Sequence, residues 1–74
     1  MDPDERELRR LLAINVHRYR DTLGLSVEAA AERSDLDRRY WTKIEAGEAN
    51  ATLRTLARLS RALGVRVALL FVQP

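Results

Sequence analysis

Seventy-four residues, 32% of them charged and none of them cysteine, are enough for one small domain with little room for an apolar core. Without cysteine the chain forms no disulfides and no thiolate metal site, so helix packing or dimerisation has to stabilise it in a reducing compartment. No apolar run approaches the roughly 20 residues that a membrane span requires, and the acidic start MDPDERE lacks the features of a signal peptide. The sequence therefore excludes a membrane protein and predicts a cytoplasmic one.

The positive charge of the chain lies away from its N-terminus. The net charge is +2 overall, but residues 8–74 contain twelve basic and seven acidic residues, which gives them a net charge of +5. Twelve of the thirteen basic residues are arginine, whose planar guanidinium forms paired hydrogen bonds with phosphate and with guanine edges. An anionic partner agrees with this composition, but so do ordinary solvated helix faces. The positions of the arginines in the predicted helices have to decide between these two interpretations.

Capping signals predict two helices in the first half of the chain. Asp2 as N-cap and Pro3 at the first helical position start a long helix that Gly24 ends. Its apolar stripe consists of Leu8, Leu12, Val16, Tyr19 and Leu23. Ser26 then caps a short helix, Val27 to Arg33, whose three consecutive alanines at 29–31 let another helix approach closely.

Two more helices follow a polar turn at residues 34–37. Asp37 caps a helix from Arg38 to about Ala46, and Thr52 caps another that carries leucines at helical spacing and ends at Gly64. We therefore predict an all-α fold, a compact bundle of four to five short helices, in a single domain of residues 1–74. The two short helices and the tight turn between them form a helix-turn-helix at residues 26–46.

The tail at residues 65–74 is almost wholly apolar and has two interpretations. One face of a fifth helix would explain its spacing and is slightly preferred, whereas its β-branched residues also suit a strand. A domain this small cannot bury both faces of the tail, so we expect a second subunit to cover one of them. The alternative is a tail tucked entirely into its own core. The predicted dimerisation residues are Val67, Leu69, Leu70, Phe71 and Val72.

The helix that starts at Arg38 has one cationic face. At about 100° per residue, Arg38, Arg39, Thr42 and Lys43 share one side, and Tyr40, Trp41 and Ile44 share the other. An α-helix fits the major groove of B-DNA, where arginine forms two hydrogen bonds with guanine. The preceding turn favours this interpretation over a merely solvated basic surface. We therefore assign base contacts to the four residues of the cationic face, on a recognition helix in double-stranded DNA.

These segments together resemble the Cro/cI-type helix-turn-helix family, also called XRE-like, over about Leu12 to Phe71. The most specific matches are GLS at 24–26, Ala31, KIEAG at 43–47 and the segment TLARLSRALGV. Within that family, LDRRYWTKIEAG is most similar to the controller proteins of restriction-modification systems. The resemblance implies a lambda-repressor-like domain that regulates transcription as a homodimer. It also places Arg38, Arg39 and Lys43 at the family's base-contacting positions, with Thr42 beside them.

The resemblance further implies an ion pair between Arg20 and Glu45 that joins the first and third helices. Contacts with the DNA backbone are assigned to Ser26, Val27, Asp37 and Asn50. The chain departs from the family at Val27, a common glutamine position, where a backbone contact with phosphate could survive. Other departures are Ala46, Asp35 at the usual turn glycine, and Trp41, which we interpret as a packing residue whose indole N–H needs a partner, although it could also touch a sugar or thymine methyl group.

An enzyme is not expected. His17 is the only histidine, no carboxylates lie at metal-ligand spacing, and Ser26 is explained as an N-cap, so we predict neither cofactor nor metal. A sequence-specific regulator of a roughly palindromic operator remains the first hypothesis, with its location in the nucleoid. The second is an antitoxin or adaptor whose main partner is another protein, such as a cognate toxin or RNA polymerase.

Overall fold

Four α-helices and one C-terminal 3-10 helix make up the fold. The computed structural model describes residues 1–74. In chain order the elements are α1 (Pro3–Thr22), α2 (Val27–Ser34), α3 (Arg38–Glu45), α4 (Leu53–Leu63) and η1 (Val67–Phe71). There is no strand, so the predicted all-α class is confirmed. None of the helices has both the length and the apolar character that crossing a membrane would require.

Each α-helix starts where its capping side chain predicts. The side-chain oxygens of four residues accept a hydrogen bond from a backbone N–H two or three positions later: Asp2, Ser26, Asp37 and Thr52. At the other end of α2, Asp35 adopts a left-handed conformation with φ 56° and ψ 41°. Aspartate tolerates this region better than most residues, so the turn forms without the usual glycine.

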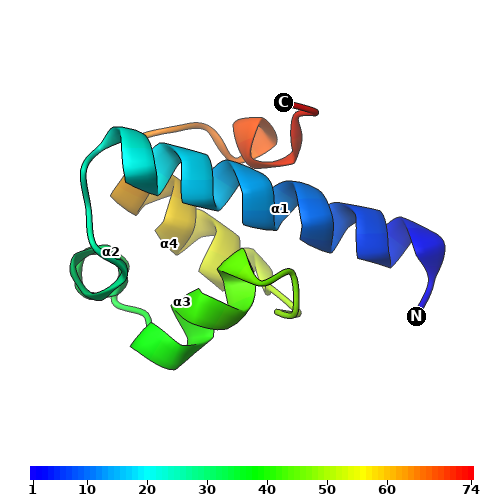
Figure 1. The fold of residues 1–74 in the computed structure, drawn as a ribbon, viewed down its shortest axis with the longest axis horizontal. Coiled ribbons are helices and arrows are strands. Elements are labelled where there is room, and N and C mark those ends of the chain that lie inside the picture. Colours follow the sequence, from blue (N-terminus) through cyan, green and yellow to red (C-terminus); the bar gives the residue numbers. More distant parts are fainter.

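The core lies between α1, α3, α4 and η1, with α2 packed against α3 and α4. Figure 1 shows α1 running along the molecule, with α3 on one side of it and the C-terminal segment on the other. Trp41, Ile44 and Leu59 are fully or almost fully buried between them. α2 packs through Ala30 and Ala31, both of which are buried, so the predicted close approach of this helix is confirmed.

The tail forms a 3-10 helix rather than a strand or an α-helix. The strand alternative is wrong, because the chain offers no other strand with which the tail could pair. Leu70 is completely buried among the core residues of its own subunit. The prediction that Leu70 contacts a partner is therefore wrong for its side chain. A chain this small has few apolar residues for its core, and Leu70 is buried in that core.

One buried polar side chain fixes the tail to α1. The Asn15 Nδ2 group lies 3.0 Å from the carbonyl oxygen of Leu70, 2.9 Å from that of Val72 and 2.9 Å from that of Leu11. Its Oδ1 accepts a hydrogen bond from Arg18 at 3.1 Å. Since the side chain of Asn15 is fully buried, these bonds satisfy its own amide nitrogen and oxygen, which water does not reach.

We expect Asn15→Ala to destabilise the protein by about 1–3 kcal/mol, because it leaves the buried Leu70 carbonyl and the partly buried Val72 carbonyl without this donor. Urea unfolding followed by the fluorescence of Trp41, the only tryptophan, measures the loss. Amide exchange at residues 69–73 should also accelerate. Asn50→Ala is the control, because Asn50 is exposed and makes no hydrogen bond within the protein. Equal stability of the two variants would contradict the assigned role of Asn15.

Candidate nucleic-acid interface

α3 presents a cationic face to solvent and an apolar face to the core. Trp41 and Ile44 are buried, and the outward residues of the helix are all exposed: Arg38, Arg39, Thr42 and Lys43. The Thr42 hydroxyl donates to the Arg38 carbonyl at 3.1 Å, which leaves its oxygen free to accept a hydrogen bond. The structure thus brings the four residues assigned to base contacts together on one accessible surface.

A bidentate ion pair ties the C-terminal end of α3 to α1. Arg20 Nε lies 2.6 Å from Glu45 Oε2, and Arg20 Nη2 lies 3.0 Å from Glu45 Oε1. Only 15% and 13% of the two side chains is exposed. The Nη1 group of Arg20 also donates to the carbonyl oxygen of Leu25 at 2.8 Å, so the same guanidinium holds the segment that leads into α2. The ion pair that the family resemblance implies is present.

Two more side chains meet at the Glu45 carboxylate. The indole N–H of Trp41 donates to its Oε2, and Nδ1 of the largely exposed His17 lies 2.8 Å from its Oε1. Burial raises the pKa of Glu45, but the hydrogen bonds from Arg20, His17 and Trp41 outweigh it and lower this pKa to about 2. The carboxylate is therefore ionised at neutral pH. Because Trp41 is fully buried, it is a packing residue, and its indole is withheld from DNA.

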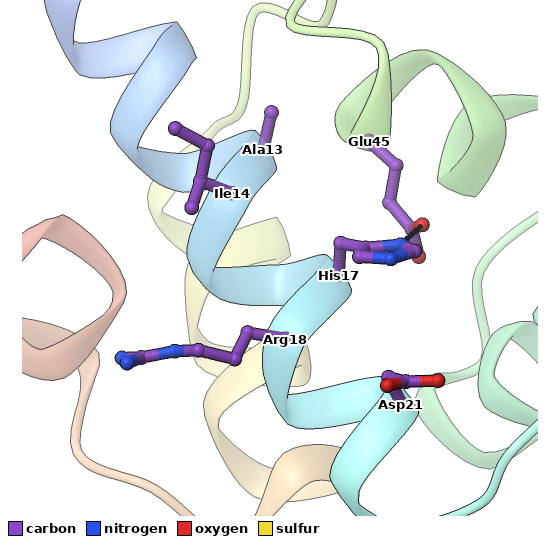
Figure 2. Close-up of a pocket in the computed structure, with 6 residues that line it drawn as sticks. All are labelled: Ala13, Ile14, His17, Arg18, Asp21 and Glu45. Atoms are coloured by element: carbon purple, nitrogen blue, oxygen red, sulfur yellow. Dashed lines mark hydrogen bonds and ion pairs between the residues drawn. The ribbon is translucent and has the colours of Figure 1, made fainter. Parts of the chain in front are cut away.

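A surface hollow lined by residues of α1 and by Glu45 lies beside this cluster, and its side chains form no catalytic arrangement. Figure 2 shows His17 and Glu45 pointing toward one another from α1 and α3, while Arg18 points to the other side of α1. Both oxygens of Glu45 already accept hydrogen bonds from Arg20, so the carboxylate serves the contact between helices. No group of three or more side chains that could hold a metal ion occurs in the chain.

The residues assigned to DNA-backbone contacts differ in what they can offer. The first two amides of α2, those of Val27 and Glu28, donate no hydrogen bond within the protein. Ser26 uses its oxygen as an acceptor for Ala29 N–H at 3.0 Å and keeps its hydroxyl hydrogen free to donate. The carboxylate of Asp37 accepts from Arg39 N–H at 2.7 Å and repels phosphate, so only its main chain suits the assigned role.

An acidic residue from a neighbouring helix lies beside the cationic face of α3. Glu28, in the first turn of α2, places Oε2 3.4 Å from Arg38 Nη1. The helical wheel of α3 contains no acid within this face, whereas the fold brings one there from the neighbouring helix. An acid in the first turn of a helix that precedes a basic recognition helix is the only sequence signal that could have indicated this pair.

Apolar side chains outside the core mark a second surface. The exposed fractions of Val67, Leu69 and Val72 are 37%, 41% and 46%. Phe71 is partly buried and lines a shallow groove with Leu8 and Leu56. Leu53, which begins α4, is the most exposed large apolar residue, with 85% of its surface accessible.

Comparison with known families agrees with this geometry. Residues 16–70 match the helix-turn-helix family HTH_3. The chain belongs to this family. The match includes α2 and α3 completely, so the cationic face of α3 lies on the second helix of the HTH_3 motif.

Relatives of this HTH_3 protein include restriction-modification controllers. It is 43% identical to the control protein C.SmaI of Serratia marcescens over 61 residues. These aligned residues cover 82% of this chain and 73% of the relative. Its fold matches the hypothetical transcription factor NHTF from Neisseria with a TM-score of 0.89 and 36% identity, over 97% of this chain and 81% of the other. It also matches the controller protein C.AhdI from Aeromonas hydrophila with a TM-score of 0.81 and 32% identity, over 85% of this chain and 96% of the other. These names describe regulators and no enzyme, in agreement with the prediction that the chain is not an enzyme.

We expect Arg20→Ala to reduce the free energy of unfolding by about 3 kcal/mol, since it leaves the partly buried Glu45 carboxylate without its main partner. Urea unfolding measures the change. Arg10→Ala is the matched control, because the contacts that it removes, with Glu7 and with Gln73, both lie on the exposed surface. A loss no larger in Arg20→Ala than in Arg10→Ala would show that the pair does not anchor α3.

Proposed function

We propose that this protein is a sequence-specific transcriptional regulator that binds double-stranded DNA as a homodimer, with α3 in the major groove. The observation that carries the proposal is the orientation of α3, whose arginines face solvent while Trp41 and Ile44 anchor the opposite side. Arg38 and Arg39 lie at the helix end that enters the groove in helix-turn-helix proteins. Each can discriminate guanine from other bases by about 1–3 kcal/mol.

The start of α2 supplies the contacts that position the protein on the backbone. The free amides of Val27 and Glu28, together with the Ser26 hydroxyl, are donors at the positive end of a helix dipole, which suits a phosphate oxygen. Asn50 is an additional exposed donor in the loop after α3. Such contacts fix the register of the protein without reading sequence.

The homodimer proposal rests on the apolar surface of the tail. Val67, Leu69 and Val72 are exposed, and Phe71 continues this surface into the groove beside Leu8. Figure 1 places the tail on the side of α1 away from α3, so a partner that covers the tail leaves the recognition helix free. A two-fold dimer then requires a roughly palindromic operator with half-sites about 10 base pairs apart.

The regulator proposal is tested by titrating the protein against fluorescent duplexes from its own upstream DNA and against random duplexes, at about 50 and 200 mM salt. We expect salt-sensitive binding with preference for one palindromic site. Arg38→Ala and Arg39→Ala should each weaken binding to that site by about 1–3 kcal/mol and relax preference at one base pair.

Arg6→Ala is the control for loss of charge, because this exposed arginine lies near the start of α1 and its side chain forms no hydrogen bond or ion pair. It should leave the preference for the palindromic site unchanged. Binding that is indifferent to sequence in the wild type and unaltered in both α3 variants would contradict the proposal. It would favour the second candidate, an antitoxin or adaptor, in which the exposed tail binds a toxin or RNA polymerase.

The dimer is tested separately by sedimentation equilibrium. We expect Leu69→Asp and Val72→Asp to shift the protein toward monomer, because each places a charge in the proposed apolar interface. Leu23→Asp is the matched control, since Leu23 is 46% exposed at the far end of α1 and lies outside the core cluster. If only Leu53→Asp dissociates the dimer, the interface lies at the start of α4 and the tail assignment is wrong.

A further inference from the structure

One acidic side chain forms an ion pair with the proposed DNA-reading surface. Glu28 belongs to α2 and Arg38 to α3, and their ion pair of 3.4 Å bridges the N-terminal ends of the two helices. The side chains are 77% and 68% exposed. No other carboxylate lies within salt-bridge distance of Arg38, Arg39 or Lys43, since the remaining ion pairs of the chain involve other cations.

Folding stability does not explain this pair. Ion pairs between exposed side chains contribute little, because water and salt screen them and two long side chains lose freedom. An acid in the first turn of α2 does interact favourably with the helix dipole, but it does so without a contact to α3. The pair has its largest effect where a polyanion approaches, which is the end of α2 that carries the free amides.

The hydrogen-bonding capacity of the Arg38 guanidinium distinguishes DNA sites that offer it a guanine from sites that do not. Arginine has five N–H donors, and a guanine edge uses two of them, so Arg38 can bind guanine while Nη1 remains with Glu28. A site without guanine lacks the paired N7 and O6 acceptors, so phosphate competes better for Arg38 there. When Arg38 turns to phosphate, it gives up Glu28 and leaves a carboxylate facing the DNA backbone. Glu28 therefore penalises non-cognate DNA more than cognate DNA.

We propose that Glu28 is a specificity-determining residue, which holds the Arg38 guanidinium for base contact and opposes its use on phosphate. This inference rests on the proposed function, because it needs α3 to read base pairs. Glu28 acts through Arg38 and through its own negative charge, and it need not touch a base. It differs from the four residues of the cationic face in that its removal strengthens binding to DNA in general.

The test compares the affinities of wild type and Glu28→Gln for the preferred site and for random duplex at about 100 mM salt. Removing one negative charge beside the backbone should strengthen random-DNA binding by about tenfold. Binding to the preferred site should change by less than about threefold, because the charge gain is offset by the loss of Arg38 positioning. The ratio of the two affinities then falls. Glu32→Gln, which removes an exposed carboxylate one turn later in α2, should leave the ratio unchanged.

A double-mutant cycle shows whether Glu28 acts through Arg38. In the Arg38→Ala background, Glu28→Gln should strengthen binding to both duplexes by the same factor. If Glu28→Gln strengthens both equally in the wild-type background too, Glu28 is only a general negative charge, and the inference is overturned while the regulator proposal stands. If the wild type shows no preference for any duplex, both proposals fail.

Discussion

The orientation of α3 depends on the Glu45 carboxylate. A helix of eight residues is too short to be stable alone, so tertiary contacts decide where its faces point. Arg20 binds this carboxylate from α1, and Trp41, one turn earlier in α3, binds it from within the core. These donors fix both the position of the helix end and its rotation about its axis. The exposure of Arg38 and Arg39 is a consequence of that rotation.

The small size of the chain explains why the tail both contributes to the core and leaves apolar side chains exposed. Ten buried residues form the core cluster, and one of them, Leu70, comes from the tail. Asn15 holds the main chain on either side of Leu70 against α1. With Leu70 turned inward, the 3-10 helix directs Leu69 toward solvent, and Val67 and Val72 at its two ends are also exposed. The same segment thus completes the core and supplies the apolar surface of the proposed dimer.

Local signals predicted most of the fold, because caps and apolar spacing act within a few residues. Asp2, Ser26, Asp37 and Thr52 mark the helix starts without any knowledge of the tertiary structure. The cationic face of α3 follows from helical periodicity in the same way. The tail was ambiguous because its conformation depends on Asn15, more than 50 residues earlier in the chain.

The pair of Glu28 with Arg38 was hidden for the same reason, since it joins two helices whose relative placement no spacing rule gives. The resemblance supplied one long-range contact, that of Arg20 with Glu45, because a family pattern carries tertiary information that a single helix does not. It could not supply contacts that depend on this chain's own residues at the departures, such as the indole of Trp41 on Glu45.

In the proposed dimer, these contacts would link folding to dimerisation and DNA binding. One α3 helix offers few contacts with DNA, so useful affinity requires two copies placed on one duplex. In the proposed dimer, the outward residues of the tail are presented only while Asn15 keeps the tail docked and Leu70 fills the core. Loss of the docked tail would therefore weaken the core and the dimer together. DNA affinity would fall as well, although the tail lies on the far side of α1 from the recognition helix (Figure 1).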